Sequence, residues 1–166
     1  MTRANAIVLL ISIPVIILMM VIFGMLHGTA NLFTIGNLAL CFSAVFVGII
    51  LHEWIHGITW MIFGHKPFSA IKFGFQWKTI TPYAHLKEPV EVNAYRIGAF
   101  MPGLILGIIP YSLNLLVGDG SLFWFSLFHT SAAGGDWLVL WLIRHVKPGT
   151  LVEDHPTNPG CYVLES

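Results

Sequence analysis

Residues 38–63 read LALCFSAVFVGIILHEWIHGITWMIF, and Glu53 is the only Asp, Glu, Lys or Arg among them. A helix of this length and composition can cross the hydrocarbon core of a membrane, which takes about twenty apolar residues. Three further stretches have the same character, at residues 6–25, 97–117 and 122–143. The sequence therefore predicts an all-α membrane protein of about four transmembrane helices, with residues 1–166 as a single domain.

The overall composition agrees with a membrane protein. Hydrophobic residues make up 56% of the chain and charged residues 10%, whereas soluble domains carry about one quarter charged residues. The net charge is zero and no basic block is present, which argues against nucleic acid as a partner. The two cysteines, Cys41 and Cys161, form neither a metal-binding pair nor a disulfide framework.

The basic residues predict how the chain is oriented, because Lys and Arg are retained on the cytoplasmic side during insertion. All eight lie in residues 1–5, 64–96 or 144–166, and the connections 31–37 and 118–121 contain none. Both termini, the loop 64–96 and the tail 144–166 are therefore expected to be cytoplasmic. The first segment has Arg3 before it and small residues at 28–30, as in a signal peptide, but its apolar core exceeds the usual length of about 7–15 residues, which favours retention.

The loop 64–96 has strand character. Apolar residues alternate strictly with other residues over 71–78, and the phase changes after Thr79 before a second short run at 83–86. This pattern predicts a short cytoplasmic β-hairpin between the second and third helices. The hairpin can lie on the membrane surface, or its free edge can accept an extended substrate by strand addition. The tail is rich in Pro, Gly and polar residues and ends in a short run at 161–164.

The five residues His52-Glu53-Trp54-Ile55-His56 form an H-E-x-x-H sequence inside the second predicted helix. Residues four apart lie one turn apart on the same helix face, so both imidazoles can bind one zinc ion at about 2.0–2.1 Å. The glutamate between them is the residue that acts as general base in metalloproteases with this motif. The motif predicts His52 and His56 as zinc ligands and Glu53 as the catalytic residue.

Asp136 is the only other acidic residue inside a hydrophobic segment. A carboxylate at the centre of a membrane helix costs about 2.5–3.5 kcal/mol on insertion, and a divalent cation would offset that cost. His56 lies eight residues before Gly64, and Asp136 lies eight residues before Arg144. At 1.5 Å per residue, both are therefore expected about 12 Å from the cytoplasmic face. Asp136 is the predicted third ligand, which leaves a fourth position open as in catalytic zinc sites.

Five other residues are candidates for the third ligand, namely His129, His85, His155, Glu88 and Glu91. His129 is seven residues before Asp136, hence about 10.5 Å away along a helix, and is better suited to a hydrogen bond between helices. The other two histidines are expected in exposed cytoplasmic segments. The two glutamates flank Pro89 in the cytoplasmic connection, which argues against a role inside the membrane.

The third predicted helix contains Pro102 and Pro110, with Gly103 and Gly107 four residues apart. The prolines predict kinks and the glycines a close helix-packing surface. An alternative role is that the kinked helix gates substrate entry, or that unpaired backbone near Pro102 contacts the substrate.

An H-E-x-x-H sequence in a membrane helix, followed two helices later by a membrane aspartate, resembles the site-2 protease group of intramembrane zinc metalloproteases. More closely, the chain resembles the family described as Putative zincin peptidase. The members of this family are small bacterial membrane proteins. The resemblance covers nearly the whole chain and rests on the sequence HEWIHG at 52–57, the Gly135-Asp136 step and Asp154-His155-Pro156. The Asn-x-x-Pro-x-x-x-x-Asp-Gly pattern of site-2 proteases is not present around Asp136, which Trp137 follows.

The resemblance implies that His52, His56 and Asp136 bind zinc and that Glu53 is catalytic. It also implies that the protein resides in the bacterial cytoplasmic membrane. The expected function is a zinc-dependent intramembrane endopeptidase, acting on membrane-embedded or membrane-adjacent proteins or peptides. The alternative is a non-catalytic zinc-binding membrane protein that binds or regulates other membrane proteins. A small transporter fits less well, because the four predicted helices show no inverted repeat.

Overall fold

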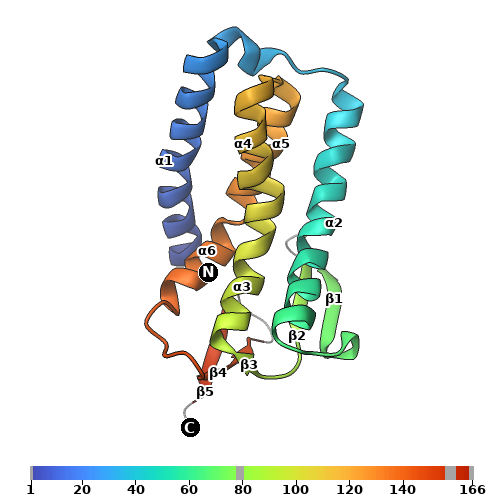
Figure 1. Ribbon diagram of the computed structural model, residues 1–166, viewed down its shortest axis with the longest axis vertical. Helices are drawn as coiled ribbons and strands as arrows, with labels where there is room; N and C mark the ends of the chain where they lie inside the picture. Colours follow the sequence, from blue (N-terminus) through green and yellow to red (C-terminus); the bar gives the residue numbers. More distant parts are fainter. Residues whose placement is uncertain (1, 78–80, 156–159, 165–166) are drawn as a thin grey trace. The chain divides into compact units, whose positions relative to one another are not determined.

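The computed structural model describes residues 2–77, 81–155 and 160–164. The fold is mostly helical, with two small antiparallel sheets (Figure 1). The chain divides into two compact units, one made of residues 1–48 and 103–135 and the other of residues 49–102 and 136–166. The expectation of one domain over residues 1–166 stays a prediction.

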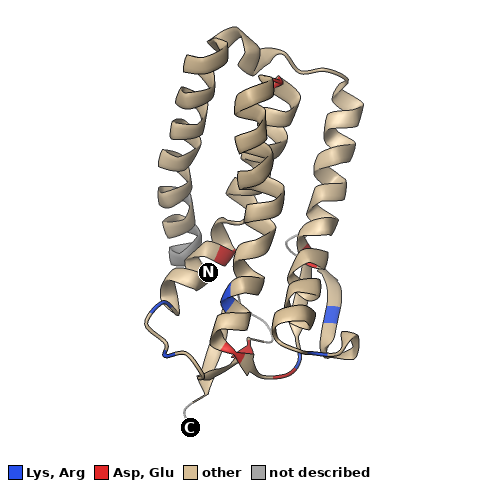
Figure 2. Ribbon diagram, viewed as in Figure 1, with Lys and Arg blue, Asp and Glu red and all other residues tan. Residues whose placement is uncertain are grey.

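The first unit is helical throughout. It contains α1 (Thr2–His27), η1 (Thr29–Phe33), the start of α2 (Leu38–Phe63), the π-helical η3 (Gly103–Ile108), α4 (Ile109–Val117) and α5 (Gly120–Ala132). Its core includes Phe23 and Phe123, both fully buried, with ring centroids 4.6 Å apart. Its described ribbon carries almost no Lys, Arg, Asp or Glu (Figure 2). Its only acidic residue among those described is Asp119, whose carboxylate accepts the Leu122 N–H at 2.7 Å and caps α5.

Three helical segments of the described chain are long and apolar enough to cross a membrane: Ala6–His27, Leu38–Phe63 and Val92–Val117. The first two agree with the predicted segments at 6–25 and 38–63, and the third begins five residues earlier than the predicted 97–117. These segments indicate a membrane protein, as the composition predicts.

The third segment consists of α3 (Val92–Pro102), η3 and α4 in direct succession. The π-helical stretch begins immediately after Pro102 and ends just before the turn that contains Pro110. Proline has no N–H to bond to the carbonyl four residues earlier, and local π-helical turns are one way a helix accommodates such a gap. The prolines therefore mark the irregular part of this helix, as expected.

The prediction of one long fourth helix over 122–143 is wrong. The chain forms α5 (Gly120–Ala132) and a separate α6 (Gly134–Leu142), interrupted at Ala133. Gly134 and Gly135 follow the break, and each glycine disfavours a helix interior by about 1 kcal/mol relative to alanine. With 13 and 9 residues, α5 and α6 are each shorter than the roughly twenty residues of a membrane span.

The second unit combines helices with both sheets. It contains the end of α2, η2 (Phe68–Ala70), β1 (Ile71–Gln76), β2 (Thr81–Leu86), β3 (Val90–Glu91), α3, α6 from Asp136 onward, β4 (Leu151–Asp154) and β5 (Cys161–Leu164). β1 and β2 form one antiparallel pair, and β3-β4-β5 form the other sheet. Its hydrophobic core includes Trp60 of α2, Leu86 of β2, Tyr95 of α3, Val139 of α6 and Val152 of β4.

The predicted pairing of the two strands in the loop is confirmed. Phe73 lies opposite Ala84, and Ile71 lies opposite Leu86. Phe73 packs on α2, where its ring stacks on Trp54 and approaches the Cα of Gly57 so closely that a Cβ there would lie 2.6 Å from it. The turn predicted after Thr79 lies outside the described residues.

The C-terminal sheet is a feature that the sequence did not predict. β4 pairs with β3 on one side and with β5 on the other. Each strand has two to four residues, too few for a period of two to stand out in the sequence. The composition of the tail predicts polar, irregular chain at 151–154, and the structure instead places Val152 in the buried core.

Candidate metal centre

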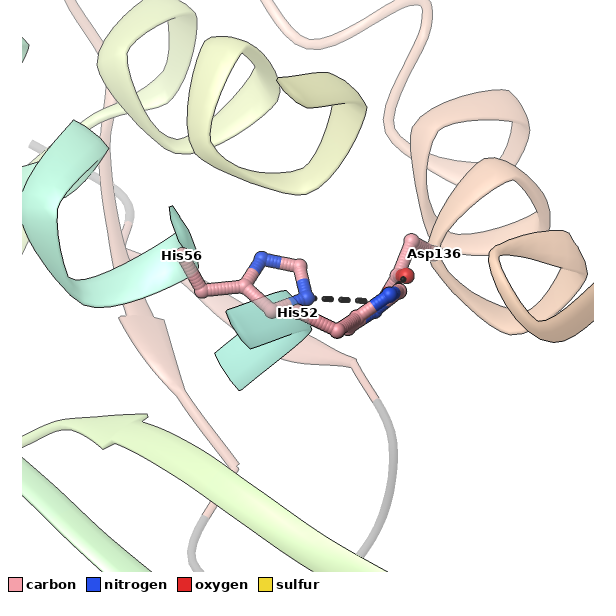
Figure 3. A group of neighbouring side chains, drawn as sticks. All are labelled: His52, His56 and Asp136. Atoms are coloured by element: carbon pink, nitrogen blue, oxygen red, sulfur yellow. Dashed lines mark hydrogen bonds and ion pairs between the residues drawn. The ribbon is translucent and has the colours of Figure 1, made fainter. Parts of the chain in front are cut away.

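Three side chains of the second unit converge on one point (Figure 3). His52 and His56 project from α2 and Asp136 from the first turn of α6. One ligand atom from each lies within 4.8 Å of the others, which makes the three residues a group that could hold a metal ion. Both histidines are buried, with exposed fractions of 8% and 6%. The residues predicted as ligands are therefore brought together, although the helix that carries Asp136 differs from the predicted one.

The donor spacing suits a tetrahedral ion. His52 Nε2 lies 3.1 Å from Asp136 Oδ2, and His56 Nε2 lies 3.5 Å from Asp136 Oδ1. Two ligands bound to zinc at about 2.0–2.1 Å in tetrahedral geometry lie about 3.3–3.4 Å apart, between those two distances. The carboxylate also sits in the first turn of α6, where the helix dipole favours a negative charge. The residues present thus fit zinc.

A backbone carbonyl fixes the orientation of His56. Its Nδ1 lies 2.9 Å from the Gly98 carbonyl oxygen and donates to it, so that Nε2 is the nitrogen directed at Asp136. Metal-bound histidines usually donate their second ring nitrogen in this way. The Gly98 carbonyl is the one that residue 102 would bond in a regular α-helix, and Pro102 has no N–H to offer it. The proline therefore leaves this carbonyl available to the histidine.

Glu53 points from α2 toward the hairpin. Its Oε2 accepts the backbone N–H of Ala84 in β2 at 2.6 Å. The carboxylate thus lies between the ligand pair of its own helix and the edge of the neighbouring strand. Sequence reasoning named Glu53 but gave no sign of its partner, because a backbone N–H leaves no signature in the sequence.

Comparison with known families agrees with this arrangement. The sequence model of the family described as Putative zincin peptidase matches residues 45–151, which include His52, Glu53, His56 and Asp136. The chain belongs to this zincin peptidase family. Neither the search of curated proteins nor that of solved structures found a match for the chain. Membership indicates a zinc metallopeptidase, and the His52/His56/Asp136 cluster supplies residues able to hold the ion.

The other candidate ligands have different surroundings. His129 belongs to α5 in the first unit and packs against Gly48. His85 pairs with Asp154 at 3.0 Å, and Glu88 pairs with Lys66 at 3.3 Å. The ring of His155 stacks on Tyr162. None of these four belongs to the three-residue group found among the described residues.

Glu91, the remaining candidate, caps the start of α3. Its carboxylate accepts the N–H groups of Asn93 and Ala94 and also that of Gly149. Burial alone would raise the pKa of Glu91, but these three backbone donors and Arg96 outweigh it and hold the pKa below its usual value of 4.5. The glutamate is thus a structural tie between α3 and the turn before β4.

Arg96 anchors the helix that carries Asp136. From α3, its guanidinium donates to the carbonyl oxygens of Ile143 and Val146, just after the end of α6. A cation at a helix C-terminus binds the last carbonyl oxygens, which have no N–H partner within the helix, and interacts favourably with the helix dipole. In the sequence, Arg96 served only as one of the basic residues that predict the orientation of the chain. Nothing in the sequence indicated that Arg96 contacts residues 143–146.

The ring of His56 is the end of a stack of three aromatic rings. The His56 ring stacks on Trp60 at 5.4 Å, and Trp60 stacks in turn on Tyr95 at 5.6 Å. A Cβ added at Gly98 would meet Trp60 Nε1 at 2.0 Å. Because rings on both faces confine the indole, it cannot move aside without disturbing His56.

We therefore expect Gly98→Ala to lower zinc affinity about 10–100-fold, the usual effect of disturbing a residue that orients a ligand. Competition with a chelator in detergent would measure it. Gly135→Ala is the matched control, since a Cβ there meets nothing within 4 Å although Gly135 adjoins Asp136. Unchanged affinity in Gly98→Ala would show that the stack does not position His56.

Proposed function

We propose that this chain is a zinc-dependent endopeptidase in which His52, His56 and Asp136 hold the ion and Glu53 is the general base. The observation that carries the proposal is the convergence of the three donors beside the carboxylate of the same H-E-x-x-H motif. Two histidines and one carboxylate leave a coordination position for water or substrate, as catalytic zinc sites do.

Zinc, when bound, supplies a Lewis acid that polarises the scissile carbonyl and lowers the pKa of its water to roughly 7. Glu53 takes the proton from the attacking water and passes it to the leaving amine as the C–N bond breaks. Gly98 keeps the His56 imidazole in the tautomer that can bind a metal. Arg96 anchors the C-terminal end of the helix that carries Asp136, and the Asp136 carboxylate lies in the first turn of that helix.

The substrates that we propose are membrane-embedded or membrane-adjacent proteins and peptides. Glu53 and the two histidines lie within the span Leu38–Phe63, so their chemistry takes place in or next to the lipid bilayer. A transmembrane helix has no free backbone groups, so a segment must be extended before hydrolysis. An extended segment can then add to the edge of β2.

The test of this function is peptide hydrolysis by the purified protein, loaded with zinc and reconstituted into vesicles. Wild type and Glu53→Gln would be compared on a quenched-fluorescent peptide mixture. Hydrolysis that depends on Glu53 supports the proposal, and hydrolysis that is equal in both preparations rejects it.

We also propose that the protein resides in a bacterial cytoplasmic membrane with both termini cytoplasmic, on the distribution of Lys and Arg. An epitope tag appended to the C-terminus should then be inaccessible to antibody in intact spheroplasts and become accessible after permeabilisation. Binding of antibody to intact spheroplasts would reverse the orientation.

A further inference from the structure

The outer edge of β2, the side facing away from β1, presents its hydrogen-bonding groups at alternate residues. The N–H of Ala84 bonds to Glu53, and the N–H of Leu86 bonds to Asp154 at 3.2 Å. Neither N–H is therefore used in the pairing with β1. Since backbone groups alternate in direction along a strand, Pro82 belongs to the same outward set.

These three outward positions differ in what they can offer to a peptide. Pro82 has no N–H. The N–H of Leu86 is held by Asp154, whose carboxylate is itself fixed by the Tyr95 hydroxyl at 2.9 Å and by His85 Nδ1 at 3.0 Å. The N–H of Ala84 is held only by Glu53, a side chain that catalysis needs elsewhere. One donor of this edge can therefore be released.

We propose that an extended substrate docks on the outer edge of β2 with one of its carbonyls on the Ala84 N–H, and that this carbonyl displaces Glu53. The inference rests on the proposed function. The substrate and the carboxylate compete for the same donor, so docking frees Glu53 to act as base. Before docking, the bond to the Ala84 N–H holds the Glu53 carboxylate, and Glu53 does not act as a base.

This arrangement also fixes the register of the substrate. An edge with several free N–H groups would accept a peptide at positions shifted by two residues. Here Pro82 on one side and the Asp154 network on the other leave a single donor. Asp154 is thus a positioning residue that acts through Leu86 and His85, and it lies outside the family match to residues 45–151.

Site-resolved hydrogen exchange of the zinc-loaded protein tests the inference directly. In Glu53→Ala, the amide of Ala84 is expected to exchange at least about tenfold faster than in wild type, because its acceptor is gone. The amide of Leu86 is the internal control and should not change. Glu53→Met, which keeps the side-chain volume, is the second variant in case Glu53→Ala does not fold.

A peptide hydroxamate then tests docking. Added to Glu53→Ala, it should restore slow exchange at Ala84, whereas acetohydroxamate, which has no peptide backbone, should not. Equal exchange at Ala84 in wild type and both variants would overturn the inference. So would binding of both hydroxamates with no protection of Ala84, although the proposed function would survive. Failure of wild type to bind zinc or acetohydroxamate would reject the proposed function together with the docking.

Discussion

Purified from zinc-replete cells, the wild-type protein is expected to carry about one zinc ion per chain, and Asp136→Ala less than about a tenth of that. His52→Ala and His56→Ala should behave in the same way. Each variant removes one of three protein donors, and the two that remain cannot hold the ion against a chelator. Elemental analysis of detergent-purified protein measures the content.

Two variants serve as controls for the zinc measurement. Glu53→Ala removes a neighbouring carboxylate that is not a ligand, and His129→Ala removes a buried histidine of the first unit. Both should keep the zinc of wild type. Loss of zinc in His129→Ala alone, or a wild-type protein without zinc, would contradict the assignment of the ligands.

Glu53→Gln is expected to lower peptide hydrolysis by about 10²–10⁴-fold while zinc content stays that of wild type. The amide has nearly the shape of the carboxylate, and it can still accept the N–H of Ala84, but it cannot take a proton from water. The rate with a quenched-fluorescent peptide in vesicles, measured beside the zinc content, separates lost catalysis from lost metal.

The control for this loss is Glu88→Gln, which makes the same chemical change in a glutamate paired with Lys66. Its rate should remain within about twofold of wild type, as for other surface substitutions. If zinc is present but wild type and Glu53→Gln are both inactive, the alternative of a non-catalytic zinc-binding protein is favoured. Equal activity in both would rule out Glu53 as the base.

The sequence predicted the parts of the fold that depend on local patterns. The apolar length of 38–63 gave the bounds of α2, and the alternation over 71–78 indicated β1. The spacing of four between His52 and His56 placed both on one helix face, as observed. That these residues and Asp136 bind zinc stays a prediction.

Asp136 was expected at the depth of His56 on the wrong premise that residues 122–143 form one continuous helix. The chain instead breaks at Ala133, and Asp136 lies in the first turn of a short new helix that begins at Gly134. The signal was present, because Gly134 and Gly135 precede the aspartate. Hydropathy does not register this break, since a glycine pair interrupts a helix without making the segment polar.

The parts that could not be predicted are backbone contacts between distant segments. The Gly98 carbonyl, the Ala84 N–H and the Leu86 N–H carry the interactions of the site, and a backbone group is the same at every residue. Asp154 was singled out only within a family resemblance. Its role depends on β4, which is too short to recognise from its sequence.

The bond from His56 to the carbonyl of Gly98 affects which substitutions the site can tolerate. Where a carboxylate orients a metal-binding histidine, a single change of that side chain abolishes the contact. Here the acceptor is part of the main chain, and no replacement at position 98 removes it. A substitution at Gly98 disturbs the site only through the side chain that it adds against Trp60. The hydrogen bond itself is sensitive four residues further on, because any other residue at Pro102 would bring an N–H that competes with the imidazole for the same oxygen. Position 102 is thereby constrained although it supplies no donor to the ion.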